Sequence, residues 1–106
     1  MLVLLFVLLL ASCKNDGFPR PTKEYYVNDY ANALFMKTRQ QIVYEGEMLY
    51  NDTKHIKTNG GAQIVVATFI IDELSEIDTF DSTGLFRSWK IGKNDMGLLI
   101  ILFFTE

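Results

Sequence analysis

The sequence predicts an α/β fold in which a mostly parallel sheet lies between two layers of helices. Residues 62–71 and 97–104 are apolar, rich in β-branched side chains and almost free of polar alternation, a pattern typical of strands buried on both faces. A segment with helical character separates them, and parallel strands need such a crossover. We therefore expect a three-layer α/β/α sandwich.

The first elements of this fold are a short strand and a long helix. Residues 25–27 (Tyr-Tyr-Val) predict an edge strand or a strap, and the polar residues 28–30 end it. From about residue 34 to 57 apolar side chains recur every seven residues, which places them along one stripe of a helix. These residues are Phe35, Ile42, Leu49 and Ile56. The glycines at 60 and 61 stop the helix.

A second helix is predicted between the two long strands. Asp72 and Glu73 end the first strand, and Ser75 followed by Asp78 has the form of a capping box. The helix is expected to continue to about Lys90, although Gly84 inside it costs about 1 kcal/mol relative to alanine.

The strand at 97–104 predicts a domain that is incomplete at its C-terminus. An apolar strand of this kind is expected to be central, with a neighbour on each side and helices over both faces. Residues 25–106 do not supply all of these elements, so we expect them to form the front part of a larger domain.

The N-terminus predicts a lipid-anchored bacterial protein. Residues 1–12 are apolar, but as a helix they reach only about 18 Å, against roughly 30 Å for a bilayer core. This length is typical of a signal peptide. Its ending, Leu10-Ala-Ser-Cys13, resembles the bacterial lipobox, so we expect cleavage before Cys13, lipidation of its thiol and a tether over residues 13–24.

Two alternatives to this interpretation remain open. No Lys or Arg precedes the apolar run, so the start could lie upstream, and Cys13 could be unmodified. Lipidation predicts a location at the bacterial cell membrane, facing the periplasm or the cell exterior, with membrane lipid as a partner. A net charge of −3 with scattered cations excludes a nucleic-acid surface. With Cys13 as the sole cysteine, the chain has neither a disulfide framework nor a zinc cluster.

Four blocks of the sequence together resemble the TPM-domain family, covering residues 27–104. They are Val27-Asn-Asp-Tyr-Ala-Asn-Ala-Leu34, Gly61-Ala-Gln-Ile-Val-Val-Ala-Thr68, Leu85-Phe-Arg-Ser-Trp-Lys-Ile-Gly92 and Gly97-Leu-Leu-Ile-Ile-Leu102. The resemblance implies an α/β/α fold outside the cytoplasm in association with a membrane. It also implies acid phosphatase activity, calcium binding or assistance to a membrane protein complex. The family usually has asparagine at the position of Met96, and its pattern continues into an Asp-Arg turn and a glycine-rich segment.

Oxygen-bearing side chains near the strand ends predict a site for calcium or another divalent cation. Ligands of open α/β sheets collect outside the carboxyl ends of the strands, and calcium takes six to eight oxygen ligands. The residues assigned to this site are Asp29, Asn94, Asp95 and Glu106; Asp72 and Glu73 are further candidates. The alternative is that these acidic residues solvate loops or cap the next helix.

Three hypotheses of function follow. The first is a membrane-tethered module for binding or assembly, stabilised by the cation. The second is a metal-dependent acid phosphatase, in which the cation polarises a phosphoryl oxygen. The third is a truncated copy without function. The first is preferred because no residue is identified as a catalytic acid, base or nucleophile; the one histidine, His55, suits a solvated helix end.

Overall fold

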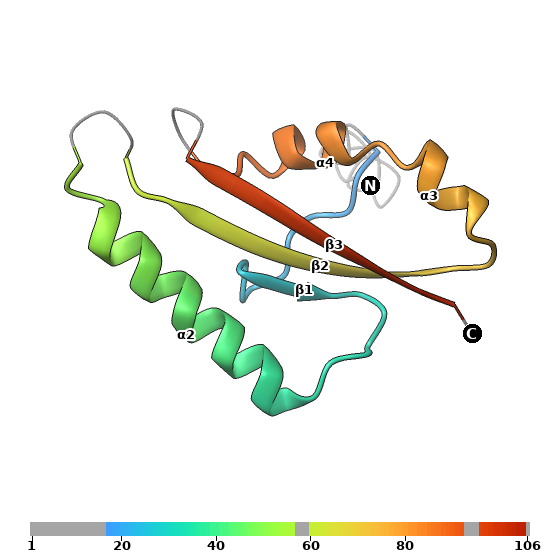
Figure 1. Ribbon diagram of the computed structural model, residues 1–106, viewed down its shortest axis with the longest axis horizontal. Helices are drawn as coiled ribbons and strands as arrows, with labels where there is room; N and C mark the ends of the chain where they lie inside the picture. Colours follow the sequence, from blue (N-terminus) through green and yellow to red (C-terminus); the bar gives the residue numbers. More distant parts are fainter. Residues whose placement is uncertain (1–16, 57–59, 93–95, 106) are drawn as a thin grey trace, which may run out of the picture.

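A parallel three-stranded sheet with helices on both faces forms the fold (Figure 1). The computed structural model describes residues 17–56, 60–92 and 96–105. The strands β1 (Val27–Asp29), β2 (Gln63–Ile71) and β3 (Gly97–Thr105) lie in that order. Helix α2 (Met36–Thr53) covers one face, and α3 (Ser75–Thr79) and α4 (Ser82–Ser88) cover the other. The predicted α/β class with a parallel sheet is confirmed.

Strand β2 is the centre of the sheet, and its two faces serve different helices. Val65 and Ala67 are fully buried and pack with Leu85, Trp89 and Ile91 in and after α4. The alternate side chains, Ile64 and Val66, face α2. Both faces of β2 therefore need apolar side chains, which explains the unbroken apolar run.

Strand β3 differs from the expected central strand. Among the described residues it pairs with β2 alone, so it forms an edge of the sheet. Its burial alternates: Leu99 and Ile101 pack against the core, whereas Leu98, Ile100 and Leu102 are 51%, 39% and 40% exposed. The described residues cover one face of β3, and a central place for this strand in a larger domain stays a prediction. An apolar run without polar alternation does not reveal which face lacks cover.

The two crossover connections have opposite hands. Both steps, β1 to β2 and β2 to β3, run the same way across a parallel sheet, but α2 lies on the opposite face from α3 and α4. One crossover is therefore left-handed, which is rare in parallel sheets.

The helix predicted from residue 75 to about 90 is two short helices. Phe80 has an extended backbone (ψ 127°) and separates α3 from α4. Asp81 then caps α4, because its carboxylate accepts a hydrogen bond from the Gly84 amide at 2.8 Å. The predicted capping box is wrong: Ser75 lies within the helix, and the Glu76 carboxylate accepts from the main-chain amides that precede it.

Helix α2 is shorter than predicted, and only the middle of its apolar stripe is used. Ile42 and Leu49 lie against β2, whereas Phe35 is 82% and Ile56 45% exposed. Gly46 is buried where α2 crosses Tyr26, and a Cβ atom at this position would lie 2.6 Å from the tyrosine ring. The close approach of α2 therefore depends on glycine.

Residues 17–25, here called the strap, lie against the domain. The indole Nε1–H of Trp89 donates to the Pro19 carbonyl at 2.7 Å. The Tyr30 hydroxyl donates to the Arg20 carbonyl, and the Thr22 amide donates to Asn28 Oδ1 at 2.7 Å. From residue 17 onward, the segment predicted to be a tether is thus held by side chains of the fold.

Candidate functional site

Most of the residues predicted to bind metal or lipid lie outside the described residues. These are Cys13, Asn94, Asp95 and Glu106. Asp29 is described, and it lies at the end of β1. The structure therefore bears on one member of the predicted cation site.

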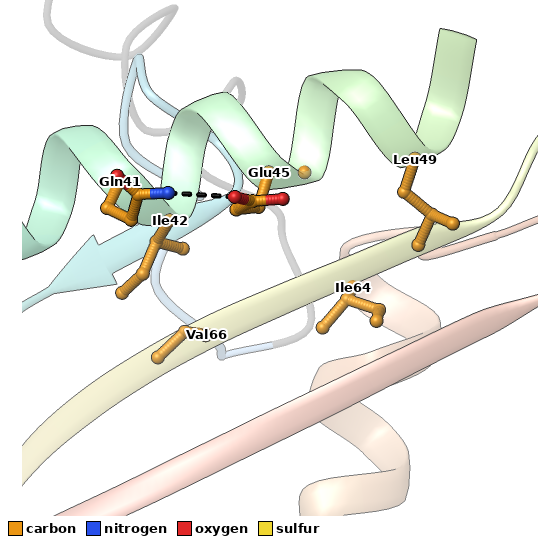
Figure 2. A pocket seen from close by; sticks show the side chains of 7 residues that line it. Gln41, Ile42, Glu45, Leu49, Ile64 and Val66 are labelled. Carbon is orange, nitrogen blue, oxygen red and sulfur yellow. Dashed lines mark hydrogen bonds between the residues drawn. The ribbon is translucent and has the colours of Figure 1, made fainter. Parts of the chain in front are cut away.

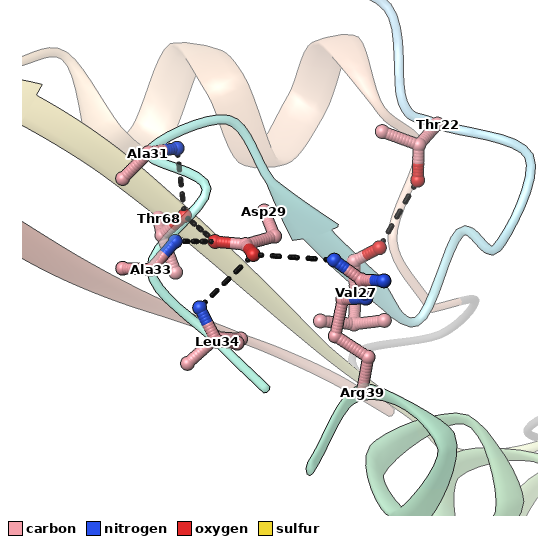
Figure 3. Close-up of polar contacts among 8 residues, drawn as sticks. All are labelled: Thr22, Val27, Asp29, Ala31, Ala33, Leu34, Arg39 and Thr68. Atoms are coloured by element: carbon pink, nitrogen blue, oxygen red, sulfur yellow. Dashed lines mark hydrogen bonds and ion pairs between the residues drawn. The ribbon is translucent and has the colours of Figure 1, made fainter. Parts of the chain in front are cut away.

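The Asp29 carboxylate lies at the centre of a polar network (Figure 3). Its Oδ1 accepts hydrogen bonds from the Thr68 hydroxyl at 2.7 Å and from the Ala33 amide at 3.0 Å. Its Oδ2 accepts from the Leu34 amide at 3.1 Å and lies 3.6 Å from an Arg39 Nη1 atom. The side chain of Asp29 is only 4% exposed. Its oxygens are therefore occupied by groups of the chain itself.

These contacts set the protonation of Asp29. Burial alone raises the pKa of the carboxyl, because it disfavours the charged form. The hydrogen bonds from Thr68, Ala33 and Leu34 and the charge of Arg39 outweigh that effect and leave the pKa below its ordinary value. Asp29 is an anion that links β1, β2 and the start of α2.

The register of the sheet separates Asp29 from the carboxylates that follow β2. Asp29 pairs with Thr68, and Asp72 lies four residues further along the chain, about 13 Å at the rise of a strand. Within the described ranges, His, Cys, Asp and Glu form no group of three or more that could hold a metal ion. Convergence of Asp29 with Asp72 and Glu73 is therefore wrong. A cation site that uses the residues outside the described ranges stays a prediction.

The opening motif of the resemblance has a structural explanation. Val27 is fully buried, and the Ala31 amide donates to the Thr68 hydroxyl at 3.0 Å. The Leu34 amide donates to Asp29, as described above. The valine of the motif is thus buried in β1, and its aspartate, alanine and leucine hold the turn between β1 and α2.

Sequence reasoning missed Asn28, which fixes the strap to the sheet. The side chain is fully buried, and its Nδ2 donates to the carbonyls of Tyr25 and Val66 at 2.7 and 3.2 Å. Its Oδ1 accepts from both the amide and the hydroxyl of Thr22. The sequence showed only a turn-forming residue after a short apolar run.

An apolar groove separates α2 from β2, and sequence reasoning missed this as well (Figure 2). Ile42 and Leu49 of α2 point toward Ile64 and Val66 of β2, and the volume between them is about 240 Å³. Glu45 lies at the rim of the groove, where it accepts a hydrogen bond from Gln41 at 2.8 Å.

The groove continues onto the exposed side of β3. In the parallel register Ile64 pairs with Leu98, and Val66 pairs with Ile100. We call Ile64, Leu98, Ile100 and Leu102 the open face, because each is at least 36% exposed. Monomeric proteins rarely expose contiguous apolar patches without a use. A surface with Glu45 as its one acidic lining residue suits binding better than acid–base chemistry.

The aromatic side chains at the end of α4 belong to the core: Trp89 is buried, and Phe86 packs against the same cluster. A search of the described residues for a helix long and apolar enough to span a membrane finds none.

Comparison of the chain with protein-family models, with curated proteins and with solved structures finds no match. The resemblance to the TPM-domain family gains no support from these comparisons and stays a prediction.

Proposed function

We propose that this chain is a membrane-tethered module that binds a protein partner outside the bacterial cytoplasm. The observation that carries the proposal is the groove between α2 and β2 with the adjoining open face. Exposing the apolar side chains of the groove and the open face to water is unfavourable. A partner can cover these side chains without burying a polar side chain that lacks a hydrogen-bond partner. A partner that covers it would therefore gain free energy from the hydrophobic effect.

The proposed partner segment is an amphipathic helix of a membrane protein complex. A helix that lies along α2 would insert apolar side chains between Ile42 and Leu49 of the groove and Ile100 of the open face, in the helix-in-groove mode of recognition. The carboxylate of Glu45 at the rim favours a basic side chain on the flank of that helix.

The proposed anchor is a lipid on Cys13. One acyl chain gives only marginal binding, but two or three chains anchor a protein stably without a spanning helix. The module would then act at the outer face of the cytoplasmic membrane. Incorporation of a labelled palmitate analogue into the full chain checks this anchor, and the label should be absent from Cys13→Ser.

Site-specific photo-crosslinking in the bacterium tests the docking surface. A photoreactive phenylalanine at Leu98 should crosslink to a subunit of a membrane complex, and mass spectrometry should map the adduct to an amphipathic helix. The same label at Asp78, which is exposed on α3 on the other side of the sheet, is the control and should give no such adduct. An adduct with a second copy of the chain, or none at all, would exclude the proposed partner.

The phosphatase hypothesis has no specific observation among the described residues in its favour. Asp29, the residue on which a test of that activity would centre, is saturated by the contacts given above. The hypothesis of a non-functional copy predicts that substitutions in the groove have no effect on any partner.

A further inference from the structure

The cations of this acidic protein are concentrated at the strap and α4. The strap, α4 and the residue pair after it carry four cations, Arg20, Lys23, Arg87 and Lys90, against the carboxylates of Glu24 and Asp81. The other described residues carry Lys37, Arg39 and Lys54 against eight carboxylates, those of Asp29, Glu45, Glu47, Asp52, Asp72, Glu73, Glu76 and Asp78. The cations thus gather at the strap and α4, whereas Glu76 and Asp78 lie in α3, in the same layer of helices (Figure 1).

Two of these cations line one hollow between the strap and the end of α4. Arg20 and Lys90 lie at its rim with Pro19, Ser88 and Trp89, and its volume is about 540 Å³. Both cationic side chains are exposed, and the ion pair of the described residues, Arg39 with Asp29, involves neither of them. Their positive charge is therefore available to an anion outside the protein.

The length of chain before the strap limits how far this hollow can lie from a lipid anchor. Four peptide steps separate Cys13 from Gly17, the first described residue, and they span about 14 Å when fully extended. Pro19 and Arg20, whose carbonyls are held by Trp89 and Tyr30, follow directly. If Cys13 carries lipid, the start of the strap therefore lies within about 14 Å of the lipidated residue.

The geometry points to a membrane-binding face, formed by Arg20 and Lys90 at this hollow, that contacts the phosphates of anionic lipids. This inference rests on the proposed lipidation of Cys13. The sheet then separates two functions: the strap and α4 face the bilayer, while α2 and its apolar groove face away toward a partner (Figure 1). The acidic residues around α3 lie beyond α4 in the same layer, so repulsion tilts that end of the domain away from the lipid.

Vesicle binding of the full chain tests this face. The leader and any acyl group partition into every bilayer, so the informative quantity is the ratio of binding to phosphatidylglycerol-containing and to pure phosphatidylcholine vesicles. Each cation near an anionic surface contributes about fivefold to binding. The double variant Arg20→Gln/Lys90→Gln should lower the ratio by about 25-fold, and 0.5 M salt should abolish the preference.

The matched control is Lys37→Gln/Lys54→Gln, which removes the same charge from α2 and its C-cap residue on the other side of the sheet. Its ratio should stay within about twofold of the wild type. Equal losses in both double variants would mean that net charge alone drives binding, and this would overturn the proposed face. Full competition by millimolar inorganic phosphate would instead assign the hollow to a free anion and overturn the lipid assignment.

Failure of this inference is distinguishable from failure of the proposed function. If Cys13 takes up no palmitate label, the proposed lipid anchor is wrong. The estimate of how close the strap lies to the membrane is then wrong too, whatever the ratio of vesicle binding. If Cys13 takes up the label but the ratio of vesicle binding is the same in Arg20→Gln/Lys90→Gln, the lipid anchor is supported. The proposed membrane-binding face is then wrong.

Discussion

At the scale of single residues, Asp29 has an architectural role. Its carboxylate receives donors from β2, from the turn after β1 and from the first turn of α2. Removing it leaves a buried hydroxyl and two amides without their acceptor, and each such loss costs about 1 kcal/mol or more.

We expect Asp29→Ala to lower the free energy of unfolding by about 2–4 kcal/mol, measured by urea denaturation. Asp72→Ala is the control: its side chain is exposed, and a change within about 0.5 kcal/mol is expected. Calcium that raises the melting temperature of the wild type but not of Asp29→Ala would contradict this role and favour the predicted cation site.

The lowered pKa of Asp29 predicts a pH dependence of stability. A carboxyl whose pKa is lower in the folded state contributes its full stabilisation above the unfolded pKa, about 3.9. That contribution is lost as the pH falls through the folded pKa. The stability difference between wild type and Asp29→Asn should therefore be constant near neutral pH and shrink below about pH 4. A difference that is unchanged at low pH would mean that the charge of Asp29 is not what the network stabilises.

The sequence identified Asp29 as important but could not show what it contacts. Its partner Thr68 lies 39 residues further along the chain, and no local pattern links the two. The same applies to Asn28, whose partner Val66 is 38 residues away. Local patterns predict turns and caps well, whereas such long-range polar pairs depend on the register of the sheet.

At the scale of elements, α2 depends on the absence of a side chain at Gly46. The glycine is unfavourable for an isolated helix by about 1 kcal/mol relative to alanine. In the folded protein it lets the helix backbone approach the ring of Tyr26. Tertiary contact thus outweighs helix propensity at this position.

We expect Gly46→Ala to destabilise the protein by about 1–3 kcal/mol in spite of the better propensity of alanine, because the added Cβ overlaps the Tyr26 ring. Thermal unfolding measures the change. Gln40→Ala, at an exposed position of the same helix, should be nearly neutral. A stabilised Gly46→Ala would mean that Tyr26 moves aside at little cost.

The sequence predicted the existence and order of the elements better than their ends. Periodicity located β2, β3 and α2, because buried strands and amphipathic helices leave strong patterns. It did not separate α3 from α4, since the break at Phe80 is a backbone change that places an aromatic side chain against Phe69 and Phe103. Nor did it show that Phe35 and Ile56, at the ends of the α2 stripe, lie beyond the sheet.

At the scale of the whole molecule, β3 offers other chains an exposed apolar face and, among the described residues, an unpaired edge. The strand is nine residues long, and none of them is charged or proline. Edge strands of this kind template pairing with other chains. Apolar patterning alone could not locate this surface, because Ile100 and Ile101 are identical in type and differ only in the face that they occupy.

That difference gives a matched pair of substitutions. Ile100→Lys places a charge on the open face, where it should keep the fold and reduce self-association, measured by light scattering of the full chain in detergent. Ile101→Lys places the same charge against the buried cluster around Val65 and Leu85, where an unpaired ammonium should abolish cooperative unfolding.

If both variants unfold alike, the face of Ile100 is buried in solution, because a second copy or another segment already covers it. If neither variant reduces association, the apolar leader at residues 1–12 drives aggregation, and β3 is not the surface through which the copies meet.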